Sequence, residues 1–394
     1  MPESTSANGW RKYRFDEMAV MVNDRIDDPS EANVEYYVGL EHLDSESLTI
    51  HRWGSPSDVE ATKLRFRAGD IIFGRRRVYQ RKLAVAHFDG ICSAHAMVLR
   101  AKSEVALAEF LPFFMQSDLF MERAKEISVG SLSPTINWKS LAKEEFALPP
   151  LEEQQRIAGV VGAADCTAES LMELLEAARL AEGSLLAELV ARCNAQEITL
   201  GSLLMESPRN GCSATETSAP TGHWVLSLSA LTRWGYRPGE LKPVEKTDAM
   251  AAAVLRQGDL LISRSNTRDL VGLPGVFDEN RTDVSWPDTM MRLTPDESRL
   301  RKRFLELFLR SPAGRRQVQS FAAGTSASMK KINATNVKKL LIPLPKPEVQ
   351  DSIESKTEPF RQARDLTQRR ISELMDFKRT LLNHALSPAA REGV

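Results

Sequence analysis

The chain has 394 residues, of which 42% are hydrophobic and 27% are charged, and its formal net charge is −1. This length predicts two or three domains that each bury a core, and the composition is typical of a soluble globular protein. A polar N-terminus and the lack of an apolar run of about 18 residues argue against secretion and against a membrane span. Four scattered cysteines fit a reducing compartment, and the cytoplasm is the predicted localisation.

The first predicted body covers residues 1–150 and has a mixed α/β pattern. Short β-type runs at Asp70–Phe73 and Ala84–Ala86 alternate with turn signals, and a helical stretch lies near 104–127. Charge is unevenly spread, because Lys63–Lys82 holds eight Lys or Arg residues and a single acid. The near-neutral total therefore hides a basic surface segment.

Residues 151–195 are predicted to form a long helix. An apolar row recurs every seven residues, and a second row fills the four-residue spacing. The first row is Ile157, Ala164, Leu171, Ala178 and Leu185, and the second is Val161, Leu175 and Leu189. A heptad sustained over about five repeats indicates a coiled-coil-like seam.

Residues 196–346 are predicted to form a second mixed α/β body, and 347–394 a second long helix. The second body has β-type runs at Asp259–Ile262 and Leu340–Leu344 and a helical stretch near 299–320. The heptad of the second helix consists of Ile353, Phe360, Thr367, Leu374 and Leu381, flanked by Ile371 and Ala385. Pro359 departs from this pattern and predicts either a kink or a helix start delayed to about Glu358.

The two halves of the chain repeat one another. Residues 136–157 match residues 332–353 at eight of 22 positions, at an offset of 196. Upstream, RAGDIIF (67–73) resembles RQGDLLI (256–262), and EFLPFFMQS (109–117) resembles RFLELFLRS (303–311). Each copy ends in a long helix, and these two helices are predicted to pack against each other along one seam. The predicted fold is therefore α/β (mixed α+β), with two duplicated bodies separated by two long antiparallel helices.

Basic clusters follow equivalent β-type runs in the two copies. Arg and Asn can form paired hydrogen bonds with base edges, while Lys, Ser and Thr suit phosphates. A solvated charged loop is the alternative for either cluster alone, but matching positions in a duplicated unit favour DNA binding. The candidate DNA-binding residues are Arg75, Arg76, Arg77, Tyr79, Arg81, Lys82, Arg264, Ser265, Asn266, Thr267, Arg268, Lys330 and Lys331.

Catalytic and metal-binding motifs are missing from the sequence. It contains no GxGxxG, GxxxxGK[ST], HExxH or paired CxxC motif. Cys92-x-x-His95, with His87 nearby, resembles half of a zinc site, but a second ligand pair at a suitable spacing is absent. We therefore expect these to be buried structural residues, and we expect no catalytic or metal site in the chain.

Several other motifs, spread over nearly the whole chain, resemble those of the specificity subunit of type I restriction–modification systems. The resemblance rests on LPPLEEQQRI opening a long helix and on its repeat LPKPEVQDSI. It also rests on GDLLISRSNT (258–267), GTSASMKKINATNVKKLLIPLP (324–345) and GWRKYRF (9–15). The resemblance implies a non-catalytic subunit in which the bodies 1–150 and 196–346 are target recognition domains. Each would read one half of a bipartite site in double-stranded DNA.

The resemblance also implies partners and cofactors. Two modification subunits would dock on the spacer helices, which set the gap between half-sites, and would use S-adenosylmethionine to methylate adenine. Restriction subunits would add translocation and cleavage with ATP and Mg²⁺, while this chain would hold no cofactor. Two alternatives stay open: a self-contained DNA methyltransferase or nuclease component, and a pseudo-symmetric protein adaptor that does not bind DNA.

Overall fold

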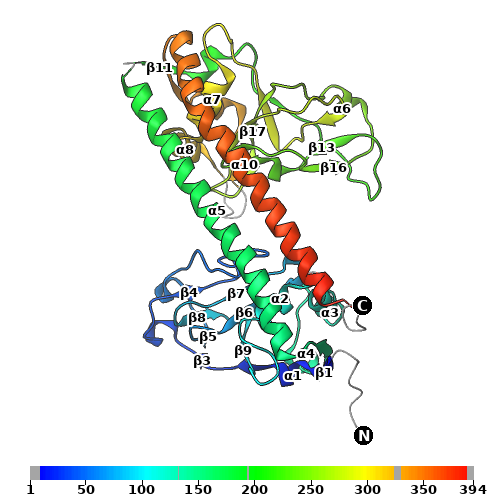
Figure 1. The fold of residues 1–394 in the computed structure, drawn as a ribbon. Coiled ribbons are helices and arrows are strands. Elements are labelled where there is room, and N and C mark those ends of the chain that lie inside the picture. Colours follow the sequence, from blue (N-terminus) through cyan, green and yellow to red (C-terminus); the bar gives the residue numbers. More distant parts are fainter. Residues whose placement is uncertain (1–8, 132, 193–194, 324–329, 388–394) are drawn as a thin grey trace. The chain divides into compact units, whose positions relative to one another are not determined.

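The computed structural model describes residues 9–131, 133–192, 195–323 and 330–387. The chain divides into two compact units: unit 1 is Met1–Ser170 with Arg370–Val394, and unit 2 is Leu171–Arg369. Figure 1 shows two long helices, α5 (Leu151–Arg192) and α10 (Pro347–Ala385), of which each unit contains a part. Mixed helix and strand in both units confirm the predicted fold class. The division into four domains at 150, 195 and 346 stays a prediction.

Unit 1 is built on two four-stranded sheets. One has the order β2-β9-β6-β7 and is antiparallel throughout; its strands are Ala19–Val22, Ala96–Ala101, Ile71–Gly74 and Leu83–Val85. The other has the order β3-β5-β8-β4, with β4 and β8 parallel; its strands are Arg25–Ile26, Lys63–Phe66, Gly90–Ser93 and Tyr37–Val38.

Short helices cover the first sheet of unit 1. They are α1 (Phe15–Met18), α2 (Leu111–Gln116), α3 (Asp118–Glu126) and α4 (Trp138–Leu141). Phe114 and Phe120 are fully buried in one core with Phe73 of β6. A separate ribbon pairs β1 (Arg11–Arg14) with β10 (Glu145–Leu148), directly ahead of α5.

Unit 2 has a similar main sheet. Its order is β12-β21-β17-β19, antiparallel throughout, with strands Arg209–Asn210, Met290–Leu293, Leu260–Ser263 and Pro274–Val276. A three-stranded sheet has the order β16-β13-β20, with β13 and β20 parallel; its strands are Leu241–Pro243, Trp224–Leu226 and Val284–Ser285.

The remaining elements of unit 2 are short helices and ribbons. The helices are α6 (Asp248–Ala251), α7 (Lys302–Arg310), α8 (Pro312–Phe321) and α9 (Ala334–Lys338). The ribbons are β11 with β23 (Gln196–Thr199, Leu341–Leu344), β14 with β15 (Leu231–Thr232, Gly235–Tyr236), and β18 with β22 (Ser265–Asn266, Lys330–Lys331).

The helical stretch predicted in each copy is in fact two helices. Ser117 has an extended backbone and caps α3, since its hydroxyl accepts from Phe120 N at 3.3 Å. Ser311 caps α8 in the same way and accepts from Gly314 N at 3.3 Å. A serine at this position satisfies an amide that the helix itself leaves unpaired, which makes the break favourable. The two serines are 194 residues apart, as in the sequence repeat.

The turn before the central strand of each main sheet is also duplicated. Gly69 and Gly258 both have φ of 88°, a left-handed conformation that glycine adopts without strain. The carboxylate of Asp70 accepts from Arg67 N at 2.8 Å, and that of Asp259 accepts from Arg256 N at 2.9 Å. The RxGD pattern of the sequence is therefore a turn signature.

A repeated glutamine joins α5 to the body of unit 1. Gln154 is buried, and its Oε1 accepts from Leu107 N at 3.0 Å. Its Nε2 donates to Val105 O at 2.9 Å and to Pro149 O at 3.0 Å. One amide therefore ties the start of the helix to the loop that leads into α2.

The same joint recurs in unit 2 at the start of α10. Gln350 is fully buried; its Oε1 accepts from Arg301 N at 2.8 Å, and its Nε2 donates to Arg299 O at 2.7 Å and Pro345 O at 2.8 Å. Only an amide offers a donor and an acceptor together at this reach, because a carboxylate cannot donate. This explains why glutamine matches between the copies.

Several positions of the two long helices are buried in both when the helices are aligned at the offset of 196. The buried pairs are Ile157/Ile353, Val161/Thr357, Leu175/Ile371, Glu182/Lys378 and Leu186/Leu382. Spacings of four and seven residues are those of a coiled-coil-like seam, as predicted. Most of the predicted heptad positions are only half-buried, because a straight helix of 3.6 residues per turn drifts away from an exact heptad. These positions are Leu171, Ala178 and Leu185 in α5 and Phe360, Thr367, Leu374 and Leu381 in α10.

The seam is antiparallel within each unit. In unit 1, Ile157 and Val161 share a core with Leu382 and Leu386, and the Asp165 carboxylate pairs with the Lys378 ammonium. Residue numbers therefore rise along α5 as they fall along α10. In unit 2, Glu182 of α5 faces Arg364 of α10, with 3.9 Å between carboxylate and guanidinium.

Pro359 lies inside α10, which begins at Pro347, so the predicted delay of the start to about Glu358 is wrong. Proline has no N–H to donate to the carbonyl of Ser355. Both residues are on the exposed face of the helix. Water can bind this carbonyl there, which explains why the helix continues.

Candidate nucleic-acid interface

In unit 1, strand β6 leads directly into the first basic loop. Gly74 ends the strand, and Arg77 adopts a left-handed conformation with φ of 57° before a short turn at Val78–Gln80. The side chains of Arg76 and Arg77 are exposed, and Tyr79 is 54% exposed. The loop thus presents two guanidinium groups and an aromatic ring to solvent, a combination suited to phosphates and bases.

Main-chain hydrogen bonds hold this loop against residues 133–136. Arg77 N donates to Pro134 O at 2.8 Å, and Ile136 N donates to Arg75 O at 3.0 Å. The Arg76 guanidinium donates to Ser133 Oγ at 2.9 Å and lies 3.3 Å from His95 Nε2. Burial and the charge of Arg76 lower the pKa of His95, which favours its neutral form. The loop is positioned by the chain segment that leads into α4.

Three of the predicted residues of this loop direct their charged groups into unit 1. Arg75 donates to Ala94 O at 3.0 Å, and Lys82 donates to Leu40 O at 2.7 Å; burial lowers the pKa of Lys82. The Arg81 guanidinium bonds Asp118 at 2.9 Å and also pairs with Glu46. These contacts shape the loop and leave Arg76, Arg77 and Tyr79 as its accessible candidates.

In unit 2, the fold brings together the two groups of predicted residues. Strand β18 pairs antiparallel with β22, so Ser265 lies opposite Lys331 and Asn266 opposite Lys330. Arg264 precedes this ribbon and donates to Asp288 O at 3.3 Å. The sequence patterns 264–268 and 330–331 are therefore parts of one surface, which local sequence did not reveal.

The exposed members of this surface are the clearest candidates. Thr267, Arg268 and Lys331 are exposed, whereas Ser265 is buried and Asn266 accepts from Thr267 N at 2.8 Å. Residues 324–329 of the predicted loop GTSASMKK lie outside the described residues. The assignment of all thirteen residues to DNA binding stays a prediction.

The two candidate surfaces occupy the same place in their units. In unit 1, Ile136 N donates to Arg75 O at 3.0 Å, and in unit 2 Ile332 N donates to Arg264 O at 2.9 Å. Both bonds join the residue after the central strand to the segment before α4 or α9. The sequence reasoning did not assign Ser133 and His95 to this site, although they position Arg76; the Ile-Asn pair repeated at 136–137 and 332–333 was the available signal.

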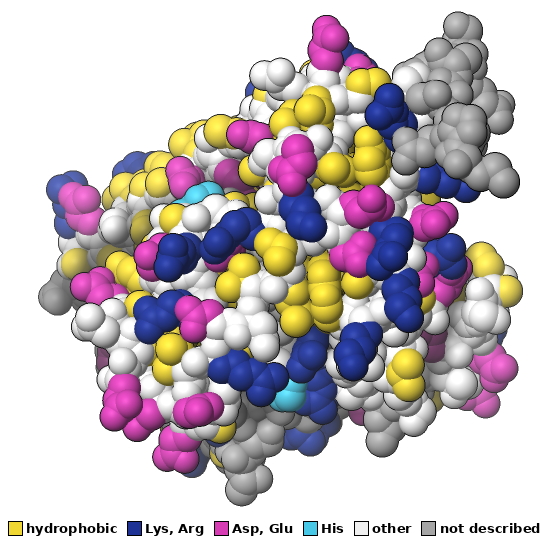
Figure 2. Space-filling view, turned by 90° about the horizontal axis from the view of Figure 1, so that it is seen from below, with side chains coloured by type: hydrophobic (Ala, Val, Ile, Leu, Met, Phe, Trp, Pro, Cys, Tyr) yellow, Lys and Arg dark blue, Asp and Glu magenta, His cyan; other side chains and the backbone are white. Residues whose placement is uncertain are grey.

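Charge on the surface is mixed. Figure 2 shows Lys and Arg side chains close together around one histidine on the face drawn, with Asp and Glu side chains elsewhere on the same face. Binding to an anionic partner would therefore depend on local clusters and not on the net charge of −1.

The described residues include no group of three or more His, Cys, Asp or Glu side chains arranged to hold a metal ion. Cys92 is fully buried, and burial raises the pKa of its thiol to about 12. Cys92 is therefore a core residue, as expected, whereas His87 and His95 are exposed, so the prediction that they are buried is wrong. Within the described ranges, no helix combines the length and apolar character needed to cross a bilayer.

Comparison with known proteins shows similarity to one class of DNA-recognition subunits. Residues 56–174 match the family model described as type I restriction modification DNA specificity domain. The EcoDI specificity subunit of Escherichia coli is 28% identical over 152 residues, which are 38% of this chain and 33% of that protein. The EcoKI specificity subunit of Escherichia coli K12 is 23% identical over 332 residues, 79% of this chain and 71% of that protein.

Among solved structures, the type I restriction–modification S subunit from M. genitalium has a TM-score of 0.49 and 14% identity, covering 99% of this chain and 98% of its own. The EcoDI match spans about a third of that relative's length. The chain is similar to type I restriction–modification specificity subunits.

Proposed function

We propose that this chain is the non-catalytic DNA-recognition subunit of a type I restriction–modification complex. Each body reads one half of a bipartite site in double-stranded DNA. The observation that carries the proposal is the duplicated surface: in both units a basic loop follows the central strand and is held by the same main-chain bond to a later segment. The loops differ between the two units while the scaffold is the same, which suits two domains that recognise different DNA sequences.

In this proposal, Arg76, Arg77 and Tyr79 act in unit 1, and Arg268 and Lys331 act in unit 2. Arginine can form paired hydrogen bonds with guanine and with phosphate, lysine contacts phosphate, and the tyrosine ring offers a stacking surface. Arg75, Arg81 and Arg264 position the loops through the contacts described above. Two tethered readers select a split site because both must engage at once.

The long helices are proposed to set the gap between half-sites and to bind two modification subunits. Those partners would carry S-adenosylmethionine and methylate adenine, and restriction subunits would use ATP and Mg²⁺. The chain would act in the cytoplasm and hold no cofactor itself. Purified chain incubated with labelled S-adenosylmethionine and DNA, or with Mg²⁺ and DNA, should give no product; a product would favour the alternative of a self-contained enzyme.

Deleting this chain from its host should remove adenine methylation from one bipartite motif. Methylome sequencing of the native strain and of the deletion strain measures this, and a strain with the gene restored is the control. If every methylated motif persists in the deletion strain, the chain does not direct a methyltransferase to DNA and the proposed function is wrong.

Lengthening both helices by four residues should widen the preferred gap by one or two base pairs. Four residues add ~6 Å of helix at 1.5 Å per residue, and the base-pair rise is about 3.4 Å. The insertions belong after Ser170 and after Arg369, where the two units meet in sequence. The methylated motif of cells carrying this variant reports the gap; an unchanged gap would contradict the spacer role.

A further inference from the structure

Unit 2 contains an arginine-rich pocket that the proposed function does not use. The cavity has a volume of about 300 Å³. It is lined by five arginines and one carboxylate: Arg179, Arg233, Arg310, Arg315, Arg316 and Asp269. They come from α5, the β14–β15 turn, the end of α7, α8 and the loop after β18, so five separate segments converge on it.

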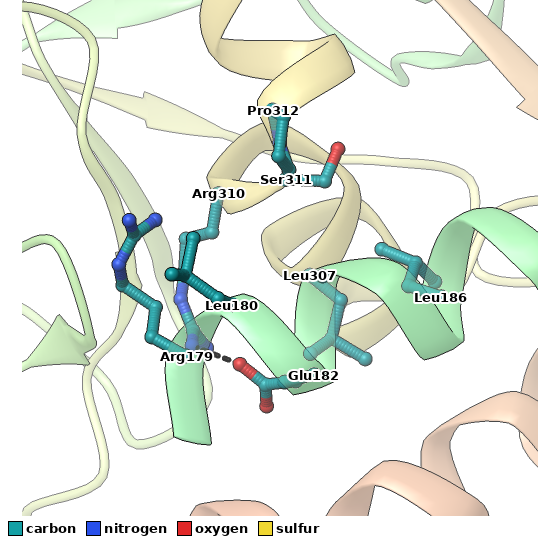
Figure 3. A pocket seen from close by; sticks show the side chains of 9 residues that line it. Arg179, Leu180, Glu182, Leu186, Leu307, Arg310, Ser311 and Pro312 are labelled. Atoms are coloured by element: carbon teal, nitrogen blue, oxygen red, sulfur yellow. Dashed lines mark hydrogen bonds and ion pairs between the residues drawn. The ribbon is translucent and has the colours of Figure 1, made fainter. Parts of the chain in front are cut away.

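Two of the five arginines are already neutralised. Arg310 pairs with Glu182 inside the unit; Figure 3 shows this contact in a smaller neighbouring pocket, with Arg179 extending from α5 beside it. Arg179 donates to Glu176 at 2.6 Å. These pairs form one wall of the cavity and fix the two guanidinium groups in place.

The other three arginines outnumber the single carboxylate. Arg233 and Arg316 are exposed, and neither has a hydrogen bond or ion pair with any residue that the structure describes. Arg315 is the deepest: its Nη2 donates to Val271 O at 2.8 Å and to Asp269 O at 3.1 Å. Its Nη1 is buried with no hydrogen-bond partner among the described residues.

The surroundings of Arg315 are unfavourable for a cation. Burial, together with the charges of Arg233 and Arg179, lowers the pKa of Arg315 to about 10, although Asp269 acts in the opposite direction. A buried unpaired donor normally has a partner such as water or an ion, and among ions the surrounding guanidinium groups favour an anion. An anion in the cavity would bind the free Nη1 and relieve the repulsion between guanidinium groups.

The duplication provides an internal comparison. At the offset of 194, Arg310, Arg315 and Arg316 correspond to Gln116, Met121 and Glu122 of unit 1. The capping serines Ser117 and Ser311 fix this alignment. The same helix pair thus folds in unit 1 without any of these arginines. The basic pocket is therefore not a requirement of the scaffold.

We propose that this pocket binds a phosphate group. Three guanidinium groups offer more donors than one carboxylate can accept, whereas the oxygens of a phosphate can accept several at once, two of them from a single arginine. The phosphate can belong to the DNA backbone or to a free phosphate-bearing molecule. If it belongs to DNA, the inference rests on the proposed function and deepens it by adding a phosphate anchor next to the candidate loop of unit 2, because Asp269 directly follows Arg268.

The test uses the full-length chain and inorganic pyrophosphate as the probe, measured by titration calorimetry in a low-salt buffer without phosphate. Arg233→Gln and Arg315→Met should each weaken binding about tenfold or more. Arg233→Gln removes no hydrogen bond or ion pair among the described residues, so it remains informative even if Arg315→Met loosens the loop at Val271. Arg256→Gln is the matched control, because Arg256 is exposed in the same unit and does not line the cavity. It should leave binding unchanged.

A second arm uses a DNA duplex and fluorescence anisotropy over a range of salt concentrations. Weaker DNA binding by Arg233→Gln, with a salt slope shallower by about one, would identify the backbone as the source of the phosphate. Loss of pyrophosphate binding with unchanged DNA binding would identify a free molecule. A third outcome is that the wild-type chain binds pyrophosphate but no DNA duplex, and that Arg233→Gln abolishes pyrophosphate binding. In that case the proposed function is wrong and this inference stands.

The inference is overturned if the Arg233→Gln and wild-type chains behave alike in both arms. It is equally overturned if Arg256→Gln weakens binding as much as Arg233→Gln does, because the effect would then report only the loss of one positive charge. Circular dichroism of each variant confirms that the chain is folded.

Discussion

A chain carrying both Arg77→Ala and Arg268→Ala binds double-stranded DNA about 10- to 100-fold more weakly than the native chain at ~0.1 M salt. The logarithm of affinity also falls less steeply with the logarithm of salt concentration, by about two in slope, since each lost phosphate contact removes about 0.9. Both side chains are exposed and have no hydrogen bond or ion pair within the described residues, so their loss should leave the loops in place. Fluorescence anisotropy with a duplex containing the methylated motif measures both quantities.

The matched control is Arg67→Ala with Arg256→Ala. These arginines are exposed and lie in the duplicated turn at the other end of the central strands, about 13 Å from the loops at ~3.3 Å per residue. The control removes the same number of charges from the same units. Equal weakening by both pairs would mean that the loops have no special role, and no weakening by either would favour an adaptor that does not bind DNA.

Glu182→Ala lowers the free energy of unfolding of unit 2 by about 3–5 kcal/mol, the range typical when one member of a buried ion pair is removed. Glu182 lies between Arg310, whose side chain is 4% exposed, and Arg364, whose side chain is 10% exposed. Burial and the charge of Arg310 already lower the pKa of Arg364. Without the carboxylate, two buried guanidinium groups would face each other uncompensated.

Hydrogen exchange measured by mass spectrometry reports the two units separately and is therefore the suitable measurement. Glu188→Ala is the control, because Glu188 lies on the same helix but pairs with Arg192 on the surface, where a pair contributes ~0–1 kcal/mol. Exchange in unit 2 should accelerate strongly for Glu182→Ala and hardly at all for Glu188→Ala. Similar protection in both variants would mean that Arg310 and Arg364 find other partners or water.

Much of the fold could be predicted because residues that match between the two copies mark positions that the structure requires. Gln154 and Gln350 match in the sequence, and both make three hydrogen bonds to the main chain at a helix start. The seam was predictable from the heptad, since burial follows helical periodicity. The breaks at Ser117 and Ser311 were missed, because a capping serine inside an apolar pattern is a weak local signal.

The candidate site was only partly predictable. The basic residues were identified from composition, but charge alone does not distinguish Arg77, which faces solvent, from Arg81, which pairs with Asp118 and Glu46. The partner carboxylates are distant in sequence, so the distinction depends on tertiary packing. For the same reason, the pairing of Asn266 with Lys330 could not be inferred from either segment alone.

The glutamine joint at each helix start makes hydrogen bonds only to main-chain groups: those of Val105, Leu107 and Pro149 in one unit and of Arg299, Arg301 and Pro345 in the other. Because these bonds do not depend on side-chain identity, the joint is insensitive to side-chain substitutions in the segments that it binds. Each reader can therefore accumulate mutations and acquire new preferences while its attachment to the helix stays unchanged. Two amides thereby allow the halves to diverge without losing the architecture that they share.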